Sequence, residues 1–282
     1  MLDADVVGAR LRRGIEYVDA TLPYLAPSDV PPYRYTFDPP PGVPKEAGEL
    51  DNRRTRIWSG WAEADGLSLD VQGFAIGHHP TPFADFRDEA AVEREYCPAM
   101  ERLVLAHTGA RRAVVFDKNV RHAPSAAQPD TFLGRPARLV HNDYTTWSAP
   151  QRVRDLLGPG PAEAVLKRRY AFINLWRPIT GPLRDAPLAL CDARSVAPET
   201  VVISTLIYPD RRGEVYRLTF SPKHRWVYFP DMNVEELIFI KCYDSSEDGR
   251  ARFSAHTAFD DPTCPPDAPA RQSVEVRTLV MW

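Results

Sequence analysis

Several features that would assign this 282-residue sequence to a specialised class of protein are missing. Its cysteines form no Cys-x-x-Cys pair, which argues against a zinc–cysteine site and favours reduced, buried thiols. They are Cys97, Cys191, Cys242 and Cys264. No window approaches the roughly 18 apolar residues that cross a bilayer, and the first residues lack the apolar core of a secretory signal. We therefore expect a cytoplasmic protein without a membrane partner.

A strong charge of either sign is also missing, because the formal net charge is −3. Without a basic field the chain has no general attraction for nucleic acid, and it has no Lys/Arg block that would bind anionic lipid. The hydrophobic content of 44% and the charged content of 26% are typical of a globular protein. We expect a small-molecule substrate and no nucleic-acid partner, and the sequence leaves the oligomeric state open.

Proline, by contrast, is abundant, with 28 residues in the chain. Proline interrupts helices and central strands, so it favours short strands joined by shaped loops. From residue 112 onwards, ten short runs rich in β-branched and aromatic residues alternate with turn signals. This pattern predicts a mainly β chain with an antiparallel sandwich or barrel. Helices are expected only at 88–108, where Pro98 would kink or divide the helix, and as two short stretches within 148–169.

The first part of the chain looks different, because prolines crowd the segment that follows Leu25. We interpret residues 1–70 as a proline-rich N-terminal arm that wraps over the core, with a disordered tail as the alternative. A strand is expected at 67–76. The first half shows no core of its own, so the sequence predicts a single domain over 1–282, with its core at 112–282.

The chemistry is expected where His141 and Asp143 stand at the end of a short apolar run. Residues two apart in a strand point the same way, so both side chains reach a common point while Asn142 faces away. His256, on a later strand among small and apolar neighbours, is the best third ligand. Two histidines and one carboxylate form the facial triad of non-haem Fe(II) oxygenases. A polar turn without metal is the alternative.

Oxygenases of this kind bind 2-oxoglutarate through a basic residue on the last core strand. Arg271 and Ser273 form an Arg-x-Ser pair suited to holding a carboxylate. Arg277 lies on the same strand face, and Lys241 is a further candidate. A salt bridge of either arginine with Glu275 is the structural alternative.

Long segments of the chain resemble the gibberellin-desaturase-like family of fungal and bacterial oxygenases, which includes a hydroxylase component of cephamycin biosynthesis. The resemblance covers roughly residues 70–282, and it is carried by 141–145, 169–196, 206–232, 240–262 and 271–280. It implies a double-stranded β-helix (a cupin-like jelly roll) with flanking helices. It also implies Fe(II), 2-oxoglutarate and O2, with His141, Asp143 and His256 as metal ligands. The family's C-terminal arginine matches Arg271 or Arg277.

The resemblance makes the protein an oxidoreductase, a dioxygenase that hydroxylates, desaturates or cyclises a small secondary metabolite or amino-acid-derived substrate. Tyr144, Trp176 and Arg177 are the candidate substrate contacts, with a turn residue, a core tryptophan and a structural arginine as the alternatives. Two other functions stay open: a jelly-roll metal-binding protein without turnover, and an O2-using iron enzyme that is independent of 2-oxoglutarate.

Overall fold

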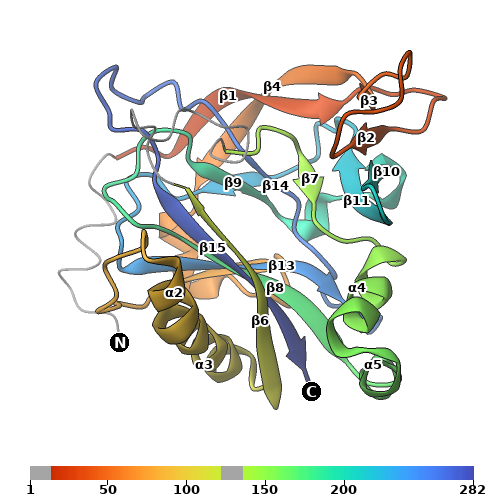
Figure 1. The fold of residues 1–282 in the computed structure, drawn as a ribbon. Helices are drawn as coiled ribbons and strands as arrows, with labels where there is room; N and C mark the ends of the chain where they lie inside the picture. The colour runs from red at the N-terminus through yellow and green to blue at the C-terminus, as the bar shows by residue number, and fades with distance from the viewer. Residues whose placement is uncertain (1–13, 122–135) are drawn as a thin grey trace.

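Two β-sheets face each other across the centre of the molecule (Figure 1). The computed structural model describes residues 14–121 and 136–282. The larger sheet has ten strands in the order β1 (Tyr17–Leu25), β4 (Leu50–Ser59), β12 (Trp226–Tyr228), β9 (Leu188–Cys191), β14 (His256–Ala258), β7 (His141–Asn142), β11 (Arg212–Leu218), β10 (Val201–Ile207), β2 (Tyr33–Tyr35) and β3 (Glu46–Ala47). The smaller has five, in the order β5 (Phe74–His78), β13 (Glu236–Asp244), β8 (Tyr170–Pro178), β15 (Ser273–Met281) and β6 (Arg112–Arg121).

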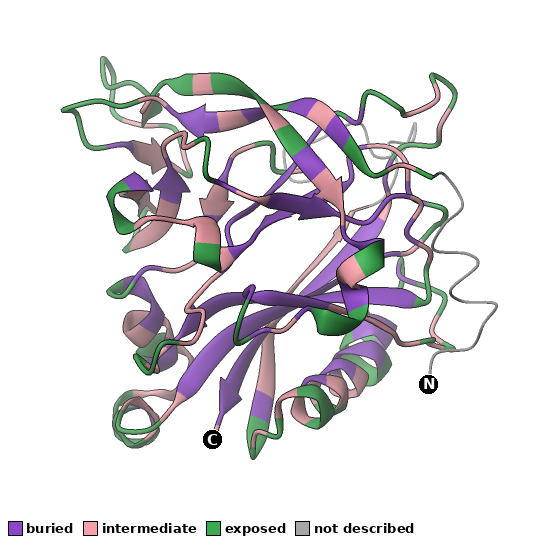
Figure 2. Ribbon diagram, turned by 180° about the vertical axis from the view of Figure 1, so that it is seen from behind, coloured by how far each residue is buried: buried purple, intermediate pink, exposed green. Residues whose placement is uncertain are grey.

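The alternation of side chains along the five-stranded sheet builds two apolar layers. Trp176 and Leu279 point between the sheets, where they join a buried cluster with residues of the ten-stranded sheet. Val274 and Val276 point the other way and pack under helices. Because both faces are covered, the central strands β8, β13 and β15 are buried almost throughout (Figure 2).

Helices cover the outer face of the five-stranded sheet and one end of the molecule (Figure 1). The long predicted helix is divided, as expected, into α2 (Glu89–Ala91), a π-helical turn η2 (Val92–Tyr96) and α3 (Cys97–Thr108). Pro98 lies in the first turn of α3, where its missing donor costs nothing. Within 14–121 and 136–282, the other helices are α4 (Ser148–Leu157), α5 (Pro159–Leu166) and three short 3-10 turns, η1 (Trp61–Gly66), η4 (Ala193–Ser195) and η5 (Pro198–Thr200).

The expectation of an N-terminal arm without regular structure is wrong for much of that segment. Strands β1 and β4 pair over nine residues, and β4 continues the sheet through β12. Val18, Ala20 and Leu22 alternate inward on β1, whereas most of β4 is solvent-facing and charged, so its pattern does not look like a strand. Residues 1–13 lie outside the described residues. Strands are therefore not confined to 112–282, since β5 also precedes that range.

The ten strands expected after residue 112 are present as β6 to β15, and the two short helices expected within 148–169 are α4 and α5. The prediction of a strand at 67–76 is wrong for its first half. Residues 68–73 form a turn in which the backbone N–H groups of residues 71–73 donate to the carbonyl oxygen of Ser68, and β5 begins only after it. All four cysteines are free thiols. Within the described ranges, the helices are too short or too polar to cross a membrane.

Candidate metal centre

The predicted ligands meet on the inner face of the ten-stranded sheet. Strand β7 pairs with β14 so that His141 lies directly opposite His256, and side chains of such partners share one face. Asp143 follows in the turn after β7. Ligand atoms of the three residues lie within 4.8 Å of one another, and His141 Nε2 is 3.6 Å from Asp143 Oδ1. The pairing of β7 with β14 thus brings together His141 and His256, which are 256 − 141 = 115 residues apart in the sequence.

Backbone carbonyls orient both imidazoles. His141 Nδ1 lies 2.7 Å from the carbonyl oxygen of Leu139, and His256 Nδ1 lies 3.1 Å from that of Ser254. A carbonyl only accepts, so each Nδ1 carries the proton and donates it. The Nε2 atoms therefore keep their lone pairs for a metal ion, the arrangement that supporting hydrogen bonds give to metal-binding histidines.

The electrostatics of the cluster also suit a divalent cation. Burial lowers the pKa of His141 to about 4, and the neighbouring imidazole of His256 adds to this. Burial alone would raise the pKa of Asp143, but Arg277 and the two imidazoles outweigh it and hold that pKa below its ordinary value. Near neutral pH the cluster therefore offers a neutral His141 imidazole, the Nε2 of His256 and a carboxylate. This donor set fits Fe(II).

Residues of the opposite sheet hold the carboxylate in place. Asn174 Nδ2 donates to Asp143 Oδ2 at 2.8 Å, and Arg277 Nε lies 3.5 Å from the same oxygen. The thiol of Cys242 is 3.8 Å away. Asn174 is fully buried on β8, so the metal centre is built from both sheets. Nothing in the sequence linked Asn174 to Asp143.

Arg271 lies further along the five-stranded sheet without a carboxylate partner for its side chain in the described residues. Arg271 Nη1 donates to the carbonyl of Ala186 at 2.7 Å, Nε lies 3.3 Å from Ser273 Oγ, and the guanidinium is 5.2 Å from the ring of Trp176. Burial, with a smaller contribution from the charge of Arg121, lowers its pKa to about 9, although Glu275 and Asp185 oppose this shift. A buried guanidinium without a counter-ion is ready to accept an anion.

Arg277 differs, because acidic groups already surround it. Its Nε lies 3.0 Å from Glu275 Oε1, and its Nη1 is 3.0 Å from Asp117 Oδ2. Burial alone would lower its pKa, but Asp143 and Glu275 outweigh this and raise it. The salt bridge with Glu275, which was the structural alternative for the two arginines, is therefore present at Arg277.

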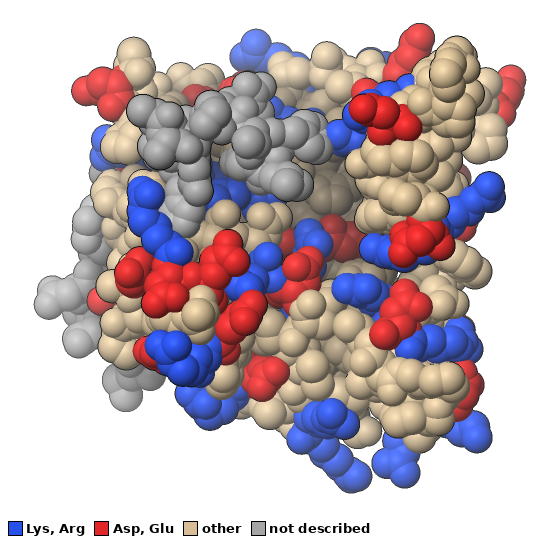
Figure 3. Space-filling model, viewed as in Figure 1, with Lys and Arg blue, Asp and Glu red and all other residues tan. Residues whose placement is uncertain are grey.

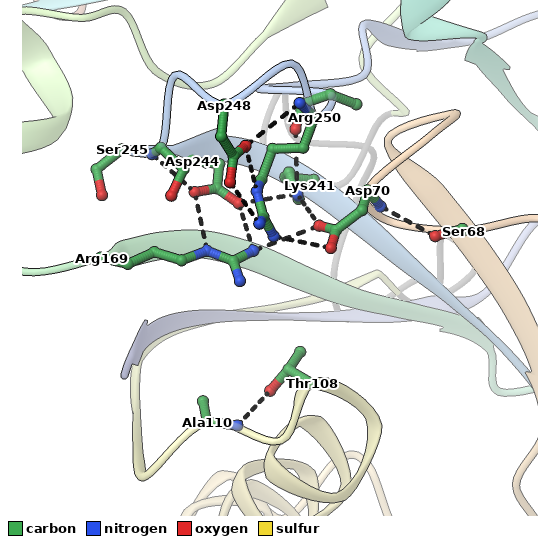
Figure 4. Close-up of polar contacts among 12 residues, drawn as sticks. Ser68, Asp70, Thr108, Ala110, Arg169, Lys241, Asp244, Ser245, Asp248 and Arg250 are labelled. Carbon is green, nitrogen blue, oxygen red and sulfur yellow. Dashed lines mark hydrogen bonds and ion pairs between the residues drawn. The ribbon is translucent and has the colours of Figure 1, made fainter.

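Lys241 does not face the metal centre, so its candidacy as an anchor is wrong. Its Nζ contacts Asp70 at 2.7 Å and Asp244 at 2.8 Å, and it donates to the carbonyl of Ala251. Arg169 and Arg250 complete this ion-pair cluster (Figure 4). The ammonium group is 1% exposed and fully engaged in a structural role.

A cavity of about 430 Å³ opens beside the metal centre. His141 and Asp143 line it, together with side chains from β2, β3, β6, β10, β11 and α4. Its lining combines aromatic groups with charged ones, including Tyr33, Arg34, Glu46, Phe116, Tyr144, Trp147, Tyr208 and Arg217. The face seen in Figure 3 is hollowed between the two sheets, and acidic and basic side chains gather around the hollow.

The three predicted substrate contacts fall in different places. Tyr144 lines the cavity and stacks on Phe172 with ring centroids 4.3 Å apart. Trp176 is 1% exposed in the core between the sheets, beneath Arg271. Arg177 is on the other face of β8, where it donates to the carbonyls of His79 and Val234. Its role as a substrate anchor is therefore wrong, and the structural alternative holds.

Comparison with known proteins decides the family. The family model described as "Oxidoreductase/YMDC permease-like domain" matches residues 22–281. The Fe(II)/2-oxoglutarate-dependent dioxygenase nvfI of Aspergillus novofumigatus is 32% identical over 253 residues, covering 87% of this chain and 89% of the relative. The chain belongs to the Fe(II)/2-oxoglutarate-dependent oxygenases. The hydroxylase/desaturase efuI of Hormonema carpetanum is 33% identical, covering 77% of this chain and 79% of that protein.

The oxygenase family also accounts for the architecture. The solved structure of the iron and alpha-ketoglutarate-dependent endoperoxidase NvfI matches 94% of this chain and 98% of its own length, with a TM-score of 0.85 and 29% identity. The mainly β fold of jelly-roll type and the predicted dioxygenase class are confirmed. Dependence on Fe(II), 2-oxoglutarate and O2 follows, so the two alternative functions are not supported.

Proposed function

We propose that this oxygenase oxidises a small secondary metabolite or amino-acid-derived molecule with iron held by His141, Asp143 and His256. The observation that carries the proposal is the convergence of their ligand atoms within 4.8 Å beside a cavity that His141 and Asp143 line. The relatives' names, hydroxylase/desaturase and endoperoxidase, support hydroxylation, desaturation or oxidative ring formation as the outcome. The motifs at 141–145 and 240–262 further support a place in the gibberellin-desaturase-like group.

The 2-oxoglutarate anchor that we propose is Arg271 with Ser273. Among the described residues, no carboxylate forms an ion pair with the buried side chain of Arg271, whereas Arg277 is already paired with Glu275 and Asp117. The guanidinium lies 5.2 Å from the ring of Trp176, and Asn174, which contacts Asp143, is two residues from Trp176 on the same face of β8. Arg271 and the carboxylate ligand are thus joined by neighbouring side chains on one face of the five-stranded sheet. Arg277 then serves to position Asp143.

When bound, the iron with 2-oxoglutarate and O2 supplies the oxidising power that removes hydrogen from an unactivated C–H bond. The chain's own residues bind, orient and exclude water. Asn174 and Arg277 fix the carboxylate of Asp143, and the stacked pair of Tyr144 and Phe172 forms an apolar wall. We also propose that the whole chain forms one domain, because β1 to β4 complete the sheet that carries His141.

The test of the iron site is the weak visible charge-transfer band that anaerobic protein shows with Fe(II) and 2-oxoglutarate. We expect the band in the wild type and its loss in His141→Ala and His256→Ala. His78→Ala is the matched control, because His78 lies on β5, where it pairs with Glu235 and is away from the three metal ligands. This variant should keep the band. A band that survives in His141→Ala would overturn the assignment. Uncoupled turnover should also consume O2 only when 2-oxoglutarate is present.

A further inference from the structure

Arg217 stands in a row with the two histidines of the metal centre. Strand β7 pairs with β11 on the side away from β14, and Arg217 is the register partner of His141, as His256 is on the other side. Register partners in antiparallel strands share a face, so Arg217, His141 and His256 all point between the sheets. Arg217 lines the same cavity as His141 and Asp143. Its guanidinium therefore flanks the reaction centre from the ten-stranded sheet.

This guanidinium is buried and incompletely bonded. Arg217 is only 9% exposed, and its Nε donates to the carbonyl of Val140 at 3.2 Å. Its Nη2 is buried and has no hydrogen-bond partner among the described residues. Removing a charged donor from water without a partner costs about 1–3 kcal/mol or more, so such a group commonly marks a site that a ligand completes.

The charged groups that face Arg217 do not neutralise it. Glu46 on β3 is near enough to favour its charge, and Arg34 on β2 opposes it. Glu46 lies 3.9 Å from Arg34, and no carboxylate within 14–121 or 136–282 forms an ion pair with Arg217. The cavity therefore presents a fixed positive charge next to the metal ligands, and the described residues supply no ion-pair partner for it.

We propose that Arg217 binds a carboxylate of the primary substrate and so fixes which carbon faces the iron. The inference rests on the proposed function. Two carboxylates compete for the role, that of the substrate and that of 2-oxoglutarate. The cosubstrate is already served by Arg271 and Ser273 on the opposite sheet. Arg217 instead belongs to the cavity lined by Tyr33, Phe116 and Trp147, which suits a larger, partly aromatic or apolar acid.

The test measures binding to anaerobic Fe(II)–2-oxoglutarate protein by titration calorimetry. The probes are indole-3-acetate, cinnamate and decanoate, each paired with its uncharged primary amide. The variants are Arg217→Met, Arg217→Lys and, as a matched control, Arg102→Met, which removes an exposed charge from α3, outside the cavity lining. The charge-transfer band of each protein gives its 2-oxoglutarate affinity independently and shows that the metal centre is intact.

We expect the wild type to prefer at least one carboxylate over its amide. Arg217→Met should lose roughly 10- to 100-fold of that carboxylate's affinity, while the affinities for the amide and for 2-oxoglutarate stay unchanged. Arg217→Lys should retain part of the carboxylate's affinity, and Arg102→Met should behave as wild type. Absence of carboxylate preference in the wild type overturns the proposal. So does a loss confined to 2-oxoglutarate, which would make Arg217 a cosubstrate residue. Absence of the band in the wild type would instead refute the proposed iron site.

Discussion

Replacing Asn174 with leucine removes the 2.8 Å hydrogen bond that this residue of the opposite sheet donates to the metal ligand Asp143. Asn174 is fully buried, and its Nδ2 lies 2.8 Å from Asp143 Oδ2. Leucine has a similar volume, so the change deletes the donor with little effect on packing. After the change, Asp143 Oδ2 keeps only Arg277 at 3.5 Å and the thiol of Cys242 at 3.8 Å.

The expected effect follows from the strength of that bond. A hydrogen bond to a charged group contributes about 1.5–3 kcal/mol, and each 1.4 kcal/mol changes an equilibrium constant about tenfold. Part of this energy orients the carboxylate before the metal arrives. We therefore expect Fe(II) to bind Asn174→Leu about 10- to 100-fold more weakly than wild type, the range known for outer partners of metal ligands.

The measurement is an anaerobic Fe(II) titration at saturating 2-oxoglutarate, followed by the charge-transfer band. Asn119→Leu is the matched control, because Asn119 lies on β6 opposite Glu275 and has no contact with the metal ligands. Thermal unfolding of the metal-free proteins shows whether each variant is folded. A folded Asn174→Leu with wild-type iron affinity would refute the argument that the two sheets cooperate in holding Asp143.

Three further predictions concern charged groups. Arg271→Gln should weaken 2-oxoglutarate binding about 10- to 100-fold in a 2-oxoglutarate titration at saturating Fe(II), followed by the same band, because a buried charge-assisted contact is lost. Unchanged affinity would assign the anchor elsewhere. Lys241→Met should lower the free energy of unfolding by about 3 kcal/mol, since Asp244 then keeps only Arg169 as its buried partner, and a change under 1 kcal/mol would contradict this. Burial raises the pKa of Asp244, but Arg169 and Lys241 outweigh it and leave the pKa below its usual 3.8. The ionised carboxylate of Asp244 therefore contributes fully to the stability of the fold above about pH 4, and this stabilisation is lost as the pH falls below that value. Wild type should accordingly lose more stability than Asp244→Asn on acidification in denaturant unfolding, and equal losses would speak against it.

The residues recovered from the sequence are those whose role depends on local spacing. His141 and Asp143 face the same way because they are two residues apart, and period-two alternation placed Val274 and Val276 on the covered face of β15. The position of His256 was inferred from its strand-like surroundings, and pairing with β7 brings it opposite His141.

What the sequence did not reveal depends on which strands become neighbours. Asn174 reaches Asp143 only because β8 faces β7 across the core. Arg217 lies beside His141 only because of the register in which β11 pairs with β7. Lys241 and Arg177 carry the right chemistry, but strand alternation turns them away from the centre. Strand β4 was not predicted, because most of its side chains face solvent and so do not show the apolar alternation of a half-buried strand.

The residues that would hold the iron and most of those that line the cavity come from different segments of the chain. The histidine ligands stand on two of the shortest strands, β7 and β14, at the middle of a ten-stranded sheet. Much of the remaining cavity lining comes from other segments: the proline-rich stretch around β2 and β3, the turn between β10 and β11, and the start of α4. Such segments can be exchanged between relatives while the iron ligands stay fixed. A chimera that carries another oxygenase's residues 33–50 would thus be a route to new substrates at an unaltered reaction centre.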